Sequence, residues 1–249
     1  MRLTVAMKPK YHDILLPLHY QYLLQGLLYQ SLKDKTFATF LHEIGFQKGK
    51  RSYKLFTFSR LFGQHKIQLN SKTILFDDEI SWHISTILPE LTQQLGEYFL
   101  LQNEVHLGDQ CLEIQSIQLT DDEVASSEVE IEMLSPLTVY STYETVDGKR
   151  KTQFFDPYDE VFSHLVEVNF RNKYEAYYGE PPRERLLIEP LHVTQKHKVV
   201  TTFKNYYITA WLGKFRLQSS PKNLTFLLQT GIGGKNSQGF GMFRVVQEL

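Results

Sequence analysis

Glycine is concentrated in residues 231–241, which hold five of the fourteen glycines in the chain. Their order is Gly-apolar-Gly, five residues, then Gly-apolar-Gly again. Glycine lets a backbone approach a ligand closely or adopt a positive φ, and a run of exposed N–H groups can hold a phosphate oxygen. This glycine segment is therefore either a phosphate-binding loop or a tight structural turn. Its candidate phosphate-binding residues are Gly231, Gly233, Gly234, Lys235, Asn236, Ser237, Gly239 and Gly241.

Two common nucleotide-binding loops do not fit this segment. A dinucleotide loop needs G-x-G-x-x-G before a helix, whereas residues 240–246 have a strand pattern. A P-loop needs Ser or Thr after Gly-Lys, but Asn236 follows Lys235. The sequence also contains no Cys pair and no H-E-x-x-H, so we expect neither a metal nor a cofactor.

Positive charge is concentrated in the first third of the chain, although the net charge is only −1. Residues 44–76 contain seven Lys or Arg and no Asp or Glu, while acidic residues gather in 121–132. Local charge, rather than the total, decides whether a surface binds phosphate. This basic run, which includes Lys50 and Arg51, is a candidate nucleic-acid surface, with a solvated loop as the alternative.

His42, just before the basic run, is the histidine best placed for chemistry. A helix over residues 36–44 has an apolar stripe made of Phe37, Phe40, Leu41 and Ile44. At 100° per residue, His42 points away from that stripe and is not a core histidine. The unperturbed pKa of histidine suits proton transfer near neutrality. The alternative for any of the nine histidines is a plain surface residue.

Size and composition are those of an ordinary globular protein with one or two domains. The chain has 249 residues, of which 42% are hydrophobic and 22% charged. Residues 23–32 are too short and too polar to cross a membrane, and we expect no signal peptide. Because the single Cys111 permits no internal disulfide, a cytoplasmic location is expected.

The expected elements form two similar series. Helices are expected at residues 17–32, 36–44 and 89–101, from Pro157 to about 178, and from about 221. Strands are expected at 2–8, 53–61, around 67, 73–87, 105–119, 129–141, 149–155, 186–193, 199–202, 207–217 and after the glycine segment. Each half can be written β-α-β-β-α-β, the ferredoxin-like unit of RNA-recognition modules. We predict an α+β fold of two tandem ferredoxin-like (RRM-like, βαββαβ) domains, residues 1–122 and 123–249.

Three segments give the chain a resemblance to a known family. They are residues 16–29 (Leu-Pro-Leu-His-Tyr-Gln-Tyr-Leu-Leu-Gln-Gly-Leu-Leu-Tyr), residues 38–43 (Ala-Thr-Phe-Leu-His-Glu) with 54–59 (Lys-Leu-Phe-Thr-Phe-Ser), and the glycine segment. Together with the paired βαββαβ halves, they make the chain resemble the CRISPR-associated repeat-processing endoribonucleases, the Cas-six family of the RAMP superfamily. The resemblance covers essentially the whole chain.

The resemblance implies metal-independent cleavage of precursor CRISPR RNA within each repeat. It implies a catalytic histidine at His42, a tyrosine at Tyr29 and a lysine at Lys54. Lys50 and Arg51 are alternatives for the lysine, because the stretch before Lys54 varies in length in the family. RNA supplies its own nucleophile, the 2′-OH, so the expected products carry a 2′,3′-cyclic phosphate and a 5′-OH. The division of acid and base roles among the three residues stays open.

The expected partner is CRISPR repeat RNA, single-stranded or hairpin, with Arg183 and Arg185 as further candidate backbone contacts. Other CRISPR-associated proteins of an effector complex and a homodimer are further candidate partners, and no membrane is expected. The alternative function is a non-catalytic RAMP-type subunit that holds RNA in an effector complex. Tyr29, His42 and Lys54 favour the enzyme, since a binding subunit does not need all three.

Overall fold

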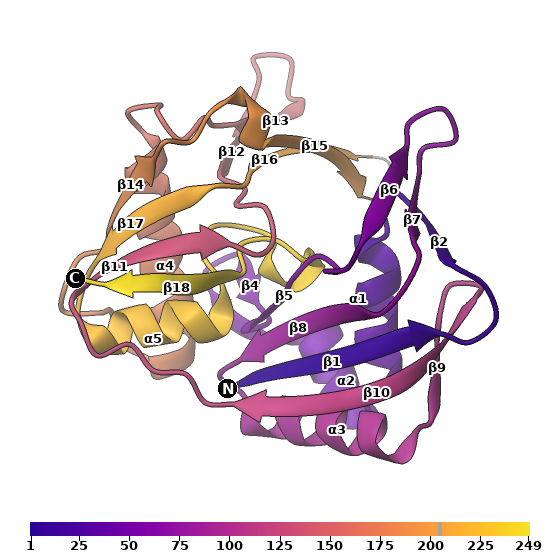
Figure 1. Ribbon diagram of the computed structural model, residues 1–249. Coiled ribbons are helices and arrows are strands. Elements are labelled where there is room, and N and C mark those ends of the chain that lie inside the picture. The colour runs from indigo at the N-terminus through magenta and orange to yellow at the C-terminus, as the bar shows by residue number, and fades with distance from the viewer. Residues whose placement is uncertain (204–205) are drawn as a thin grey trace.

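The computed structural model describes residues 1–203 and 206–249 and contains two main sheets, one in each half of the chain (Figure 1). The first half comprises β1 (Arg2–Pro9), β2 (Ile14–Pro17), α1 (Gln21–Gln30), α2 (Lys35–Thr39), the π-helix η1 (Phe40–Ile44), β3 (Phe46–Lys48), β4 (Arg51–Tyr53), β5 (Phe56–Phe58), β6 (His65–Gln68), β7 (Thr73–Phe76), β8 (Ile80–Thr86), α3 (Pro89–Leu101), β9 (Glu104–Leu107) and β10 (Gln110–Thr120). The second half comprises β11 (Glu128–Met133), β12 (Tyr140–Glu144), β13 (Arg150–Phe154), α4 (Phe162–Tyr178), β14 (Leu187–Leu191), the 3-10 helix η2 (Gln195–His197), β15 (Lys198–Phe203), β16 (Tyr206–Trp211), β17 (Lys214–Gln218), α5 (Pro221–Thr230), the 3-10 helix η3 (Asn236–Gln238) and β18 (Phe243–Glu248).

The two main sheets share one topology. Their strand orders are β5-β8-β1-β10-β9 and β14-β17-β11-β18, and neighbouring strands run antiparallel. In each sheet the first strand, β1 or β11, lies between the third and fourth strands of its unit. A helix follows the first strand and another follows the third, which is the βαββαβ arrangement. The predicted α+β fold of two ferredoxin-like units is therefore confirmed.

Alternation along the strands explains how each sheet covers its core. In β11, Val129, Ile131 and Met133 are buried, while the glutamates between them are only partly covered. Two of those glutamates form ion pairs with arginines of the neighbouring strands β17 and β18. The same strand thus supplies a core face and a charged face, because successive side chains point to opposite sides.

The first long helix is shorter than the sequence predicts. Residues 14–17 form β2, which pairs with β7, and α1 begins only at Gln21. The Leu18 N–H donates to the carbonyl of Lys72 at 2.9 Å. Pairing with a distant strand therefore keeps the start of the predicted helix extended, and the helix begins later than the apolar pattern indicates.

Several predicted strands are in fact two strands each. Residues 73–87 divide into β7 and β8, residues 105–119 into β9 and β10, and residues 207–217 into β16 and β17. Gly108, with φ 62°, and Gly213, with φ 110°, turn the chain in two of these places. Alternation of apolar and polar residues continues across such turns, so the pattern alone does not reveal them.

The glycine segment joins the two halves of the chain. It follows α5 and lies between the two sheets, next to β5 (Figure 1). Thr57 of β5 donates through Oγ1 to the carbonyl of Phe240 at 3.0 Å. Gln25 of α1 donates through Nε2 to the carbonyl of Ser237 at 2.6 Å. These two hydrogen bonds hold β5 and α1, in the first half of the chain, against the glycine segment near its end.

Candidate active site

Two neighbouring cavities lie where the first half of the chain meets the glycine segment. The smaller one, about 320 Å³, brings together Tyr29, His42 and Lys54 with Lys235 and Ser237 of the glycine segment. Its other lining residues are Gln25, Phe203, Tyr206, Ile208 and Gln238. The three predicted catalytic residues and part of the glycine segment therefore share one site, which we name the cleavage cavity after the role predicted for these residues.

His42 lies on a single π-helical turn, η1, that continues α2. The Gly45 N–H donates to the carbonyl of Phe40, five residues back, at 2.7 Å. Gly45 ends the helix with φ 63°, and π turns are frequent at functional sites. The predicted apolar stripe is only partly correct. In this wider turn Ile44 is 49% exposed, and Leu41 is the one buried residue of the four in the stripe.

The His42 imidazole is oriented by two neighbours. Its Nδ1 lies 2.6 Å from Oε1 of Glu43, and its ring meets Tyr29 edge to face, with 5.0 Å between the ring centroids. A carboxylate at Nδ1 accepts the hydrogen of that nitrogen, so Nε2 is left to exchange a proton with a substrate. The His42 side chain is 57% exposed, which leaves it accessible to RNA.

Tyr29 lies in the last turn of α1, partly buried between His42 and Phe56. Burial raises the pKa of its hydroxyl well above the usual value, and the charge of Glu43 raises it further. The phenol therefore stays protonated near neutral pH. It can donate a hydrogen bond to a phosphate or sugar oxygen, but it is not a base under these conditions.

Lys54 lies between β4 and β5 and lines both cavities. Burial lowers the pKa of its ammonium group, and the charge of Glu43 partly opposes this. The next residue, Leu55, is buried and has φ 57°, an uncommon value for a residue other than glycine. Such conformations persist only where the surroundings hold them, and they cluster at functional sites. Here the carbonyl of Leu55 accepts a hydrogen bond from Thr86 Oγ1 at 2.9 Å.

A buried lysine holds the glycine segment. Lys173 of α4 is 1% exposed, and its ammonium donates to Asn236 Oδ1 at 3.1 Å and to the carbonyl of Gly231. Asn236 in turn donates to the carbonyls of Ile232 and Phe240, both at 3.1 Å. Loss of hydration lowers the pKa of Lys173 to about 7. The segment is thus tied to α4 and to itself through one amide side chain.

Four of the five glycines in the segment have positive φ. A Cβ on Gly241 would lie 1.9 Å from the carbonyl oxygen of Ile232, and one on Gly239 would lie 2.5 Å from the Phe58 ring. The fold itself therefore requires glycine at these positions, while the side chains of Lys235 and Ser237 line the cavities. Contact between this backbone and RNA stays a prediction.

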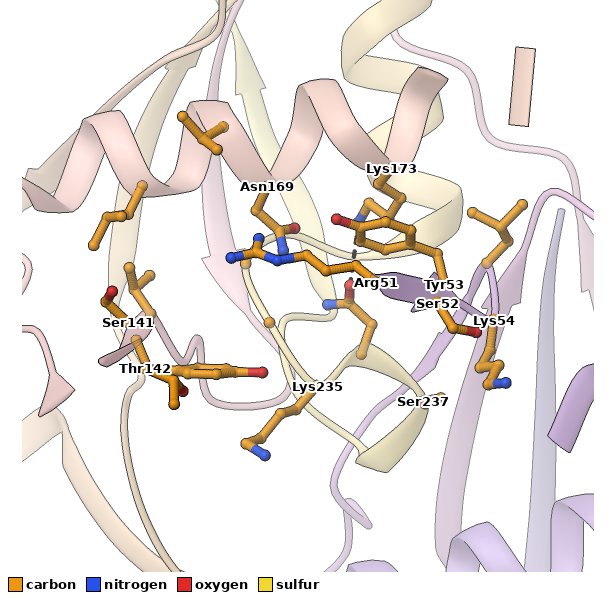
Figure 2. A pocket seen from close by; sticks show the side chains of 18 of the residues that line it. Arg51, Ser52, Tyr53, Lys54, Ser141, Thr142, Asn169, Lys173, Lys235 and Ser237 are labelled. Carbon is orange, nitrogen blue, oxygen red and sulfur yellow. Dashed lines mark hydrogen bonds between the residues drawn. The ribbon is translucent and has the colours of Figure 1, made fainter. Parts of the chain in front are cut away.

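The larger cavity, about 440 Å³, adjoins the cleavage cavity through Lys54, Lys235 and Ser237, which line both (Figure 2). Arg51 of the basic run also lines it. Further lining residues from the glycine segment are Gly233, Gly234 and Asn236. Four of its lining residues are basic, and none of those that the structure describes is acidic.

Three charged residues among the predicted RNA contacts lie outside the described lining of both cavities, as do Gly231, Gly239 and Gly241. Lys50 is exposed at the turn between β3 and β4, and Arg183 and Arg185 lie between α4 and β14. Arg185 donates to the two carboxylate oxygens of Glu167, at 3.0 and 3.2 Å. All three stay predictions as RNA contacts.

Sequence reasoning missed Glu43 and Gln25, which position the site. Glu43 contacts His42 and follows it directly in the sequence, so its proximity could have been a signal. Gln25 lies one helical turn before Tyr29, on the same face of α1, and binds the glycine segment at Ser237. Nothing in the sequence links Gln25 to a residue more than two hundred positions away.

No three His, Cys, Asp or Glu side chains within residues 1–203 and 206–249 come together as a candidate metal site. No helix in the same part of the chain is both long and apolar enough to cross a membrane.

Two family models together match nearly the whole chain. Residues 119–245 match the model "CRISPR associated protein Cas6, C-terminal", and residues 15–118 match "CRISPR-associated protein Cas6, N-terminal". The chain belongs to the Cas6 family. The family indicated by the sequence resemblance is therefore confirmed.

Individual Cas6 relatives agree with this membership. The CRISPR-associated endoribonuclease Cas6 of Pyrococcus furiosus is 29% identical, over 98% of this chain and 90% of its own length. A solved structure of a Cas6-related protein from Pyrococcus furiosus has a TM-score of 0.86 at 23% identity, covering 100% of this chain and 99% of that one. A RAMP protein described as binding different RNA substrates has a TM-score of 0.84 at 24% identity, covering 99% and 100%. These two structures support the Cas6 fold.

Proposed function

We propose that this Cas6-family chain is a metal-independent endoribonuclease that cuts precursor CRISPR RNA within its repeats and so produces guide RNAs. The observation that carries this proposal is the meeting of His42, Tyr29 and Lys54 with Lys235 and Ser237 in one cavity. A proton-transfer group, a neutral donor and two cations suit the cleavage of an RNA phosphodiester. The endoribonuclease from Pyrococcus furiosus, similar over nearly the whole chain, supports the same activity.

The proposed reaction uses a nucleophile that belongs to the RNA. The 2′-oxygen of a ribose attacks the adjacent phosphorus while its proton passes to a base. The bond between phosphorus and the 5′-oxygen breaks, and that oxygen takes up a proton. The products are a 2′,3′-cyclic phosphate and a 5′-hydroxyl. One proton is lost and one gained, so the step needs no further reactant.

The residues of the cleavage cavity divide these tasks by their chemistry. His42 can transfer protons through Nε2, and Glu43 at Nδ1 holds the ring in place. Tyr29 stays protonated because burial raises its pKa, so it donates to an oxygen of the phosphate or sugar. Lys54 and Lys235 supply positive charge to the phosphate oxygens. Single variants, compared across pH, would assign the acid and base steps.

The test is incubation of the purified protein with end-labelled repeat RNA in EDTA. We expect one cut within the repeat, with a 5′-hydroxyl on the downstream product. His42→Ala should bind the RNA but lose cleavage, whereas His12→Ala, an exposed histidine outside the described lining of both cavities, should cut at the parent rate. Parent-like cleavage by His42→Ala would exclude His42 from the mechanism.

A non-catalytic RNA-binding subunit is the second candidate. The RAMP protein described as binding different RNA substrates has the same fold over the full length of the chain. Basic cavities next to a glycine segment also suit binding without cleavage. Tight binding of repeat RNA by the unaltered protein, without any cleavage, would favour this second function.

Domain limits, partners and location are finer parts of this proposal. We place the domains at residues 1–122 and 123–249, with the division in the connection between β10 and β11. Beyond repeat RNA, the proposed partners are other CRISPR-associated proteins of an effector complex and a second copy of this chain. The proposed location is the cytoplasm, where the precursor RNA would be met.

A further inference from the structure

The larger cavity contains two buried polar atoms without partners. The Tyr53 hydroxyl and Asn169 Oδ1 belong to residues that line it, and neither atom has a hydrogen-bond partner among the described residues. Buried polar groups are almost always paired, because leaving one unpaired costs stability. Two such atoms at one cavity point to a ligand that supplies the missing partners.

The charge around this cavity indicates what that ligand carries. Arg51, Lys54 and Lys235 line it, and its described lining contains no Asp or Glu. Figure 2 shows Arg51, Tyr53 and Asn169 directed into the same part of the cavity. The ligand that this lining fits combines a negative charge with hydrogen-bonding groups.

An aromatic ring completes the lining. Tyr140 is partly buried, and the Lys235 ammonium lies 5.0 Å from its ring centroid. RNA-binding proteins stack unpaired bases on such rings and hydrogen-bond the base edges. The volume of 440 Å³ lies within the range of about 300–1,000 Å³ that is usual for small-ligand sites. Size, charge and lining together fit a nucleotide.

We infer that the larger cavity receives one unpaired nucleotide of the RNA, close to the nucleotide that is cut, and that Asn169 and Tyr53 read its base. The inference rests on the proposed endoribonuclease function, since Lys54 and Lys235 connect this cavity to the cleavage cavity. With the base placed in this way, Arg51 binds the phosphate of the same nucleotide.

The Asn169 amide selects the kind of base. Its unpaired Oδ1 accepts a hydrogen bond and its Nδ2 donates one. Such an amide can pair with the amino group and ring nitrogen of adenine or cytosine, or with the carbonyl and ring N–H of uracil or guanine. The buried positions of Oδ1 and of the Tyr53 hydroxyl limit which of these edges fits. We therefore expect one base to be preferred over the others at one position near the cut.

Two variants of similar shape test the inference while sparing the fold. Asn169→Leu and Tyr53→Phe each remove an atom that has no partner in the free protein, so Tm should stay unchanged or rise. The Kd for repeat RNA should rise about 5- to 100-fold for Asn169→Leu, the scale of one specific base contact. Tyr158→Phe changes an exposed tyrosine outside the described lining of both cavities and should alter neither quantity.

Cleavage of a pool of repeat RNAs, randomised around the cut, measures the base preference directly. RNAs cut by the unaltered protein should be enriched in one base at one position, and Asn169→Leu should lose that enrichment. Equal enrichment with both proteins, no enrichment with either, or a large fall in Tm would overturn the inference while leaving the endoribonuclease function intact. An unaltered protein that neither binds nor cuts the RNA would overturn both.

Discussion

Gly239 is the residue at which the glycine segment packs against β5. Its φ is 82°, and an added Cβ would lie 2.5 Å from Cε2 of Phe58, with two further ring atoms at 3.0 and 3.1 Å. Phe58 is 0% exposed and packs edge to face on Trp82, with 5.8 Å between the centroids. Because this ring is enclosed, it cannot move aside for an extra methyl group without disturbing the core.

We therefore predict that Gly239→Ala destabilises the protein substantially. A left-handed backbone costs an alanine about 1–2 kcal/mol relative to glycine. Forcing a methyl group into a packed core costs about 1–3 kcal/mol more. The expected loss is the sum, about 2–5 kcal/mol, which is a large share of the roughly 5–15 kcal/mol that stabilises a typical domain.

Urea unfolding followed by circular dichroism measures this loss. Gly96→Ala is the matched control, because Gly96 lies within α3 and an added Cβ would meet nothing within 4 Å. That control should gain about 0.5–1 kcal/mol, the helical preference for alanine over glycine. Phe58→Leu removes the ring atoms that the added Cβ would meet. The double variant should therefore lose less stability than the two single variants lose in total.

RNA affinity, measured on the same folded proteins, completes this test. If glycine at position 239 serves packing, the folded fraction of Gly239→Ala should bind repeat RNA nearly as well as the parent. A Gly239→Ala protein that is as stable as the parent but binds RNA more weakly would refute the packing argument. It would show instead that Gly239 admits the RNA backbone.

Four further predictions concern single residues and metal. Cleavage should continue in EDTA, and activity that EDTA abolishes and Mg²⁺ restores would contradict the proposed mechanism. His42→Ala should slow single-turnover cleavage about 100-fold or more, the usual scale for a proton-transfer group, with Kd within about twofold of the parent. Tyr29→Phe should slow cleavage without changing the shape of the pH–rate profile, since burial keeps this hydroxyl protonated; a lost alkaline limb would argue for a phenolate. Lys173 has its pKa lowered by burial to about 7, so the unfolded chain binds one more proton than the folded chain between about pH 7 and 10. Stability should rise with pH through that window by at most about 1.4 kcal/mol per pH unit, and Lys173→Met should remove this rise in urea unfolding at pH 7 to 9.

Local signals in the sequence determined much of the fold. The helix Pro89–Leu101 has the predicted limits, because proline suits a first helical turn and apolar residues recur on one face. Gly179 ends α4 in the left-handed conformation that glycine adopts at little cost. The order of helices and strands then leads to two βαββαβ units, each with its first strand inside the sheet. Such features depend on residues a few positions apart, which a single sequence displays.

The sequence also identified three residues of the cleavage cavity, Tyr29 and Lys54 through family resemblance and His42 also through its position on the predicted helix. Tyr29, His42 and Lys54 belong to the segments that carry the resemblance, and the structure places them together with the glycine segment. Their assignment as catalytic residues stays a prediction that the variants above test.

Only the tertiary structure decided how the glycine segment is supported and what lines the larger cavity. Phe58 opposes Gly239, and Lys173 binds Asn236, across long separations in the sequence. In the sequence, Asn169 is simply one polar residue of an amphipathic helix. The structure shows that its Oδ1 is buried without a hydrogen-bond partner among the described residues. Burial, packing distance and an unmet hydrogen bond arise only when distant segments are brought together. For that reason no local pattern in the sequence could reveal them.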